Sequence, residues 1–265
     1  MTYRALTIAG SDSGGGAGIQ ADLKTFQELK VFGMSAITAI TAQNTLGVQG
    51  VYPMTPSAVA EQIESVASDI GVDAIKTGML FDSSIIRVVA EKIRQFGWEQ
   101  VVVDPVMIAK GGAPLLQQEA MKALKEELLP LAKVVTPNIP EAEAITGMTI
   151  TTMDERQLAA RKLYDMGVKN VVIKGGHDDA EDEAIDLLFD GSSFTYFTSK
   201  KIETKHTHGT GCTFAAAIAA SLAQGKTVIE AVQIAKDFIQ AAIENNLGLG
   251  HGHGPTNHWA YKEGK

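Results

Sequence analysis

The feature that most constrains the fold is an alternation along the chain between short apolar runs and longer amphipathic segments. The short runs are rich in Val, Ile and Ala, which is typical of strands, and the longer segments repeat their apolar residues at the helical period. Expected strands cover 4–9, 34–42, 72–77, 100–104, 132–136 and 170–174, and expected helices cover 17–30, 56–70, 83–97, 116–130 and 154–167. This alternation predicts an α/β protein with a mainly parallel sheet covered on both faces.

The last third of the chain departs from the alternation. Residues 184–189 and 193–198 flank the turn sequence DGSS and are predicted to form a hairpin, and two alanine-rich helices are expected at about 212–224 and 227–246. No fixed-period repeat, low-complexity tract or linker interrupts the sequence. With 265 residues, of which 45% are hydrophobic, the chain is expected to fold as one domain, residues 1–265.

Charge and cysteine content limit the partner and the compartment. A formal net charge of −8 without any basic run argues against a nucleic acid or an anionic membrane as partner, so a small molecule is expected. Cys212 is the single cysteine, which excludes an intrachain disulfide. No signal peptide is expected, and no apolar run approaches the ~18 residues of a membrane span. These features predict a cytoplasmic protein.

Polar and glycine residues follow the ends of the predicted strands. In an open α/β sheet, ligands bind beyond the carboxyl ends of the strands. Turns favour Gly, Asn and Asp without any function, so each position alone is explained by turn formation, but together they predict a binding site. These positions are Gly10 to Gly18, Gln43 and Asn44, Gly78 and Met79, Asp104 and Pro105, Asn138, and Lys174 to Gly176.

The stretch GSDSGGGAGIQAD, residues 10–22, is a glycine-rich turn of the kind that often binds phosphate. It lacks the lysine and hydroxyl of the P-loop, because Gly16 and Ala17 follow instead, and Ile19 stands where the dinucleotide motif requires its third glycine. Asp12 would also repel a phosphate. The loop is therefore expected to bring its backbone close to a compact neutral ring, with a tight turn at positive φ as the structural alternative.

A second glycine turn, HTHGTGCTFAAA at residues 206–217, suits phosphate better. It contains no acidic residue and leads into an alanine-rich helix, whose free N–H groups and dipole attract anions. Ordinary N-capping by Thr210 or Thr213 is the structural alternative. Cys212 lies at the helix start, where the helix field is expected to lower the thiol pKa and favour a nucleophile or base, whereas a small apolar filler is the alternative.

A bound phosphate also needs a cation to screen its charge. Residues that could hold a cation lie at the same edge of the predicted sheet. Asn138 and Glu141 stand three apart at a strand end and helix start, and Asp104 ends the neighbouring apolar run VVVDP. Their oxygens suit a cation, although a favourable charge in a first helical turn would explain Glu141 alone. Lys174 closes VVIKGG and is expected to meet a phosphate.

A series of motifs over nearly the whole chain resembles the hydroxymethylpyrimidine and phosphomethylpyrimidine kinases of thiamine synthesis, within the ribokinase superfamily. The motifs are AGSDSGGGAGIQADLKTF, ITAQNT, KTGML, VVDPVMIAKGG, TPNIPEAE, VIKGGH, THGTGCTFAAA and GHGPTNH. The resemblance implies a ribokinase-like three-layer αβα sandwich with a mainly parallel central sheet, and a homodimer. It also implies an ATP- and Mg²⁺-dependent kinase that phosphorylates 4-amino-5-hydroxymethyl-2-methylpyrimidine and then its monophosphate to the diphosphate.

The resemblance gives the first glycine loop and its surroundings a role in binding the pyrimidine. Gly10 and Ala17 are expected to wall the pocket, and Gln43 is expected to hydrogen-bond the aminopyrimidine edge, for which its amide offers both a donor and an acceptor. Met79 and Val106 are expected to cover the ring faces.

The resemblance also assigns the phosphate half of the site. Asp104, Asn138 and Glu141 are expected to hold Mg²⁺, and Asn138 and Lys174 to bind the nucleotide phosphates, with Lys174 also catalytic. The expected anion hole and further nucleotide contacts are Thr207, Gly209, Thr210, Gly211 and Cys212. Ribokinases generally carry Asp as the base at the last of these positions, so Cys212 is the candidate base here, with Gly209 and Gly211 as its catalytic neighbours.

Other functions stay open from the sequence. A pyridoxal kinase of the same branch would also act on a hydroxymethyl heteroaromatic, but Gln43 favours the pyrimidine enzymes, and Ala109 matches the position where related pyridoxal kinases carry a lid cysteine. A thiol hydrolase or transferase would use Cys212 with His206 or His208. A metal-binding role is suggested by the C-terminal histidines, although a turn or partner contact is the favoured explanation for them. Those histidines are His251, His253 and His258.

Overall fold

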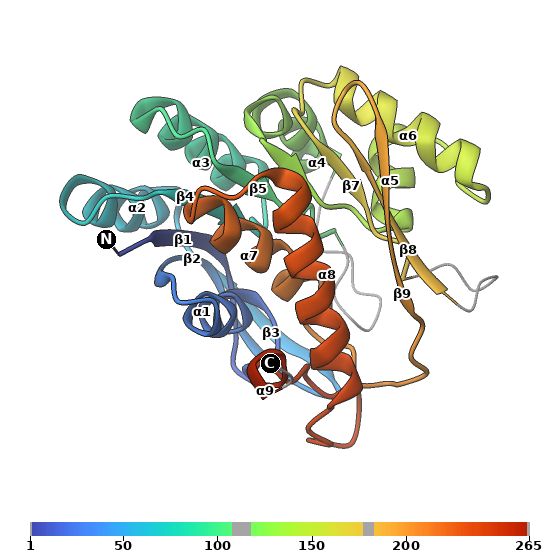
Figure 1. Cartoon of the computed structure of the whole chain (residues 1–265). Helices are drawn as coiled ribbons and strands as arrows, with labels where there is room; N and C mark the ends of the chain where they lie inside the picture. Colours follow the sequence, from blue (N-terminus) through green and yellow to red (C-terminus); the bar gives the residue numbers. More distant parts are fainter. Residues whose placement is uncertain (1, 108–117, 177–182, 264–265) are drawn as a thin grey trace.

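A computed structural model of the chain describes residues 2–107, 118–176 and 183–263 (Figure 1). Within these residues, nine strands form one sheet in the order β3-β2-β1-β4-β5-β6-β7-β8-β9. The strands from β2 to β7 in that order pair in parallel, whereas β3, β8 and β9 are antiparallel to the strands beside them. The strands are β1 (Arg4–Asp12), β2 (Phe32–Asn44), β3 (Gly47–Pro53), β4 (Ala74–Thr77), β5 (Val101–Val103), β6 (Val134–Val135), β7 (Val171–Ile173), β8 (Glu183–Phe189) and β9 (Phe194–Lys200).

The strand sequences explain why helices cover both faces of the sheet. Leu6 of β1 belongs to one apolar core and Ala5 to another, and in β5 Val103 and Val102 divide in the same way. Side chains alternate between the two faces of a strand, so a strand that is apolar throughout needs cover on both sides. The predicted three-layer α/β architecture is therefore confirmed.

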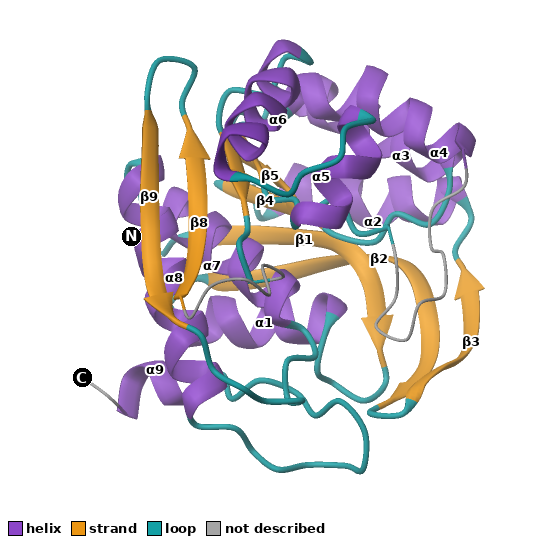
Figure 2. Cartoon of the chain, turned by 90° about the vertical axis from the view of Figure 1, so that its right-hand side faces the viewer, coloured by secondary structure: helices purple, strands orange, loops and turns teal. Residues whose placement is uncertain are grey.

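Each face has its own set of helices (Figures 1 and 2). One core packs beneath α2 (Pro56–Asp69), α3 (Ser83–Phe96), α4 (Gln118–Ala123), α5 (Ile139–Thr146) and α6 (Met153–Asp165). The other packs beneath α1 (Gly18–Glu28), α7 (Thr210–Ala223) and α8 (Val228–Glu244), and a short α9 (Ala260–Glu263) follows. Among the described residues, no helix is long and apolar enough to cross a membrane.

Some elements differ from the sequence prediction. The edge strand β3 was not predicted, because its two glycines and terminal proline weaken the strand pattern and are tolerated where one side of a strand is unpaired. Helix α5 has only eight residues and begins with a capping box in which Asn138 and Glu141 each bond the backbone N–H of the other. The helix expected at 116–130 consists, within the described residues, of α4, a π-helical turn at Leu124–Leu128 and a 3-10 turn at Leu129–Leu131.

The strand order fixes where a ligand can bind. Strand β1 lies between β2 and β4, so the chain leaves it toward β2 on one side and later returns to β4 on the other. Such a reversal leaves a crevice at the carboxyl ends of the strands, between the loops that diverge there. The loop after β1 and the residues after β4 and β5 meet at this point.

Candidate active site

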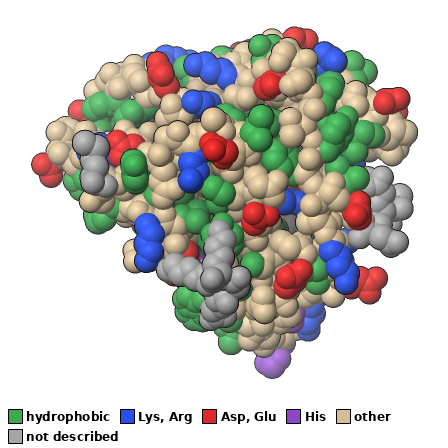
Figure 3. Space-filling model, in the orientation of Figure 1, with side chains coloured by type: hydrophobic (Ala, Val, Ile, Leu, Met, Phe, Trp, Pro, Cys, Tyr) green, Lys and Arg blue, Asp and Glu red, His purple; other side chains and the backbone are tan. Residues whose placement is uncertain are grey.

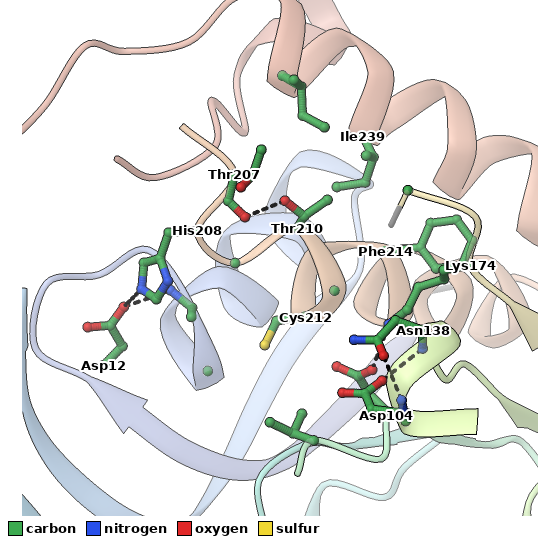
Figure 4. A pocket seen from close by; sticks show the side chains of 18 of the residues that line it. Asp12, Asp104, Asn138, Lys174, Thr207, His208, Thr210, Cys212, Phe214 and Ile239 are labelled. Atoms are coloured by element: carbon green, nitrogen blue, oxygen red, sulfur yellow. Dashed lines mark hydrogen bonds and ion pairs between the residues drawn. The ribbon is translucent and has the colours of Figure 1, made fainter. Parts of the chain in front are cut away.

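A cavity of about 820 Å³ opens beyond the carboxyl ends of the parallel strands. Segments far apart in sequence meet in it, as Figure 4 shows for part of its lining. Every site residue expected from the sequence lines this cavity: Gly10, Ala17, Gln43, Met79, Asp104, Val106, Asn138, Glu141, Lys174, Thr207, Gly209, Thr210, Gly211 and Cys212.

The first glycine-rich loop binds a carboxylate of the protein itself. The backbone N–H groups of Gly14, Gly16 and Ala17 donate to Asp12 at 2.8, 2.9 and 2.8 Å. Burial alone would raise the pKa of Asp12, but the hydrogen bond from His208 and those from the backbone hold it below its usual value. These amide groups are therefore occupied by Asp12, which explains in structural terms why a glycine turn of this kind does not need a phosphate.

The same loop approaches its neighbours closely enough to require glycine. A Cβ on Gly10 would stand 2.4 Å from the Met79 methyl carbon, and one on Gly18, where φ is +56°, would stand 2.2 Å from the Gly10 carbonyl oxygen. Gln43 follows a β-bulge at the end of β2, and its Nε2 lies 3.2 Å from Nε2 of His208. The bulge turns the end of β2 toward the cavity, and Gln43 lies there beside Gly10, Ala17 and Met79.

Charged groups gather on the opposite side of the cavity. Lys174 Nζ lies 3.1 Å from Asp104 Oδ1, and both side chains are largely buried. Burial and the Asp104 charge raise the pKa of Glu141 to about 7, although Lys174 opposes this. Burial alone would lower the pKa of Lys174, but the carboxylates of Asp104 and Glu141 raise it above its usual value. Lys174 therefore stays a cation beside the buried carboxyl group of Asp104 and the half-buried one of Glu141.

Helix α7 begins at the cavity without a side-chain cap. Its N-cap is Gly209, with φ +83°, and no side chain of the described residues bonds the first amide groups there. N-capping by Thr210 or Thr213, the alternative considered from sequence, is wrong: the Thr210 hydroxyl donates back to the Thr207 carbonyl, and Thr213 Oγ1 bonds His258 Nε2 at 3.0 Å. The helix start thus presents uncapped N–H groups beside Lys174, an arrangement that suits a phosphoryl group.

The Cys212 thiol does not have the lowered pKa expected from its place at a helix start. Burial and the carboxylates of Asp22 and Asp104 raise its pKa to about 11, against the opposing effect of the Lys76 ammonium and a hydrogen bond from the Gly18 backbone. Burial and these two carboxylates, which come from other parts of the fold, outweigh the field of the helix. In the free protein Cys212 is therefore a thiol at neutral pH.

Several lining residues were missed from sequence. Phe214 and Ile239 form an apolar part of the cavity beyond Lys174 (Figure 4). Ile243 of α8 and Ile202 of the segment after β9 also line the cavity. On α7 and α8 these apolar side chains have the same periodicity as the core positions, so no sequence signal distinguishes them. The contact of His208 with Asp12, at 2.8 Å, was also missed, because it joins residues 196 positions apart.

The histidine-based alternatives lack the contacts they require. His208 bonds Asp12 and Gln43, and within the described chain no hydrogen bond joins Cys212 to His206 or His208. Of the C-terminal histidines, His258 is buried against Thr213, and His253 Nδ1 donates to the Lys205 carbonyl at 3.1 Å. Ala109, which bears on the pyridoxal kinase alternative, lies outside the described residues.

Comparison with known proteins identifies the family. Residues 12–257 match the family model described as phosphomethylpyrimidine kinase. The chain is 59% identical over 260 residues to the hydroxymethylpyrimidine/phosphomethylpyrimidine kinase of Bacillus subtilis (strain 168), covering 98% of this chain and 96% of that protein.

Solved structures share its fold. The pyridoxal kinase of Staphylococcus aureus in complex with AMP-PCP and pyridoxal is 41% identical, with a TM-score of 0.91 over 98% of this chain and 95% of the other. The phosphomethylpyrimidine kinase of Clostridium difficile 630 is 44% identical, with a TM-score of 0.82 over 91% of this chain and 100% of the other. These similarities confirm the ribokinase-like fold, and the extent of the family match shows that the chain belongs to the phosphomethylpyrimidine kinase family of phosphotransferases.

Proposed function

We propose that this protein uses ATP to phosphorylate 4-amino-5-hydroxymethyl-2-methylpyrimidine, and then phosphorylates the monophosphate to the diphosphate, in thiamine biosynthesis. The observation that carries the proposal is that one cavity joins two chemically different halves. One half has the Gln43 carboxamide and close-packed glycine backbone, which suit a neutral aminopyrimidine. The other has Lys174 and the uncapped start of α7, which suit phosphate.

In the pyrimidine half, we assign the ring to the space bounded by Gly10, Ala17, Met79 and Val106. Glycine backbone and apolar side chains bury a flat ring without leaving polar groups unpaired. Gln43 is the residue here whose side chain offers a donor and an acceptor to one ring edge. Bound in this way, the ring presents its hydroxymethyl group toward Cys212 and the start of α7, which line the same cavity.

In the nucleotide half, we assign the adenine to the apolar surface of Phe214, Ile239 and Ile243, and the phosphates to Lys174, Asn138 and the α7 turn. The substrate hydroxyl oxygen forms a bond to the γ-phosphorus as the bond from that phosphorus to the β,γ-bridging oxygen breaks, and ADP leaves with that oxygen. The hydroxyl proton passes to Cys212 in its thiolate form. Because the thiol pKa is about 11, this form is a minor one at neutral pH, so positioning and the α7 amides carry much of the rate.

The residues at Asp104, Asn138 and Glu141 fit Mg²⁺. The carboxyl groups of buried Asp104 and half-buried Glu141, with an amide oxygen, are hard ligands of the kind this ion accepts. Burial and the Asp104 charge raise the pKa of Glu141, and a divalent cation would relieve the repulsion between the two carboxylates. When bound, Mg²⁺ neutralises charge on the transferring phosphates. Lys174, already beside Asp104, would hold the phosphates from the same side of the cavity.

We also propose that the protein is a cytoplasmic homodimer. Ile40 of β2 and Tyr52 of β3 are cross-strand neighbours that are 49% and 64% exposed, and Leu46, in the turn between these two strands, is 70% exposed. Exposed apolar side chains of this size are typical of interfaces. Light scattering after size exclusion tests the dimer.

The face in Figure 3 carries Lys, Arg, Asp and Glu side chains interspersed, which offers no continuous basic surface to a nucleic acid.

The activity is tested by ADP release with Mg-ATP on three substrates at matched concentrations: the hydroxymethylpyrimidine, its monophosphate and pyridoxal. We expect turnover on both pyrimidines, with the monophosphate giving a diphosphate, and a lower kcat/KM for pyridoxal. Turnover on pyridoxal alone would show that the phosphate half is correctly assigned and the pyrimidine half wrongly assigned. Absence of ADP release with all three would overturn the proposal.

A further inference from the structure

His208 is buried between an anionic side chain and the amide expected to bind the substrate ring. It is 8% exposed and Asp12 only 2%. His208 Nε2 lies 2.8 Å from Asp12 Oδ2 and 3.2 Å from Gln43 Nε2 (the bond to Asp12 is drawn in Figure 4). The three residues come from the end of β1, the end of β2 and the turn before α7, so the contact links three separate parts of the cavity wall.

The hydrogen atoms in this cluster can be placed by counting donors and acceptors. Asp12 receives three backbone N–H bonds and its pKa is lowered, so its carboxylate is an anion and only accepts. His208 Nε2 must therefore carry a hydrogen and donate it to Asp12. This holds whether the imidazole is neutral or charged, because Nε2 is protonated in both forms.

That assignment determines the orientation of the Gln43 carboxamide. A protonated Nε2 has no lone pair for an amide N–H, so two donors would face each other across the 3.2 Å between the two nitrogens. Half a turn of the carboxamide places Oε1 beside His208 and Nε2 beside Thr41 Oγ1, also at 3.2 Å. Thr41 can accept there, because its own hydroxyl hydrogen goes to the Ser11 carbonyl at 2.8 Å.

From this network we infer that Asp12 and His208 are positioning residues that lock the Gln43 carboxamide in one orientation and thereby set which ring edge the pocket accepts. The inference rests on the proposed pyrimidine kinase function. With Oε1 accepting a share of the single His208 Nε2 hydrogen that also goes to Asp12, and with one N–H held by Thr41, Gln43 offers the ligand one remaining N–H and one remaining lone pair in a fixed order. The substrate presents a ring nitrogen that accepts and an amino group that donates. A 4-oxo analogue presents the reverse order.

Glycine packing supports a rigid lock. A Cβ on Gly16 would stand 2.6 Å from His208 Cδ2, so the loop backbone lies directly against the imidazole. The His208 backbone N–H also donates to the Gly254 carbonyl at 3.1 Å. The ring is therefore held by its backbone, by the loop and by Asp12, and rotation of Gln43 alone would leave His208 Nε2 facing an N–H group.

The first test compares kcat/KM for the 4-amino substrate and the 4-oxo analogue, in the wild type and in His208→Leu. We expect the wild type to prefer the amino substrate by about 100-fold, because the wrong ring edge leaves buried groups unpaired. In His208→Leu the carboxamide is free to turn, so this preference should fall at least tenfold while the KM for ATP changes less than threefold. His206→Leu, from the same segment but outside the cavity lining, should keep the preference. An unchanged preference in folded His208→Leu would overturn the inference.

The second test does not depend on activity. Nitrogen-15 NMR of labelled histidine identifies the protonated ring nitrogen, and the His208 signals are assigned as those lost in the His208→Leu protein. We expect a hydrogen on Nε2 of His208 in the ligand-free wild type. A hydrogen on Nδ1 alone would overturn the inference even if the enzyme phosphorylates the pyrimidine. Conversely, failure of the wild type to use any pyrimidine would refute the proposed function, while the NMR result would still decide the lock.

Discussion

Substitution of Gly209 by alanine should separate catalysis from stability. Gly209 has φ +83°, and a Cβ there would stand 1.7 Å from the Gly16 carbonyl oxygen. An ordinary carbon to carbonyl oxygen contact is about 3.3 Å, so the turn before α7 and the first glycine loop must separate by about 1.6 Å. The displaced turn carries the amide groups assigned to the transferring phosphoryl group. A misplacement of this size is expected to lower kcat by on the order of 100-fold or more.

The chain offers a matched control at the other end of the same helix. Gly225 has φ +80°, and a Cβ there would meet no described heavy atom within 4 Å. Gly225→Ala therefore carries the same backbone strain, about 1 kcal/mol, without the collision. For a chain of this size that strain lowers Tm by roughly 2–4 °C.

The assay is ADP release under saturating substrates, together with thermal unfolding of both variants. We expect Gly225→Ala to lose a few degrees in Tm and to keep its kcat within about twofold, while Gly209→Ala loses kcat in the folded protein. Equal kcat values for the two variants, with both folded, would refute the assignment of the phosphoryl site to the α7 turn.

Three further perturbations have defined outcomes. Lys76→Met leaves Asp22 as an uncompensated buried charge, because Lys76 Nζ and Asp22 Oδ2 are 2.9 Å apart and both side chains are fully buried. Chemical denaturation should show that the free energy of unfolding falls by roughly 3–5 kcal/mol, and a fall of less than about 1 kcal/mol would contradict this. The raised pKa of Glu141 means that its protonated form stabilises the metal-free protein below pH 4.5, and that this contribution is lost as pH rises through about 7. Tm of the metal-free protein should therefore fall between these two pH values, and Glu141→Gln should make Tm depend less on pH. Cys212→Ala should lower kcat by on the order of 100-fold with little change in the KM for ATP, and near wild-type turnover would remove Cys212 from the chemistry.

The sequence located the cavity lining well because that information is local. In a parallel sheet the residue after each strand lies at one edge, so Gly10, Asp104, Asn138 and Lys174 can be placed together once the strands are recognised. The capping box that opens α5 follows from the same kind of local signal, the three-residue spacing of Asn138 and Glu141. The roles of these residues and the single-domain organisation stay predictions.

What the sequence could not supply depends on tertiary contacts. The pKa of Cys212 is raised, where the sequence predicted a lowered one, because the fold buries the thiol and brings the carboxylates of Asp22 and Asp104 near it. The His208 to Asp12 bond brings together residues 196 positions apart, and no local pattern links them. The apolar part of the cavity was missed because Phe214 and Ile239 have the periodicity of ordinary core residues.

The most direct test of these assignments is a crystal structure of the protein with the hydroxymethylpyrimidine and a non-hydrolysable ATP analogue. We predict that the aminopyrimidine edge lies against Gln43, the γ-phosphate at the Gly209 to Cys212 turn beside Lys174, and the hydroxymethyl oxygen between them. A γ-phosphate bound instead by the glycine loop at residues 13–17, or a pyrimidine bound away from Gln43, would contradict them.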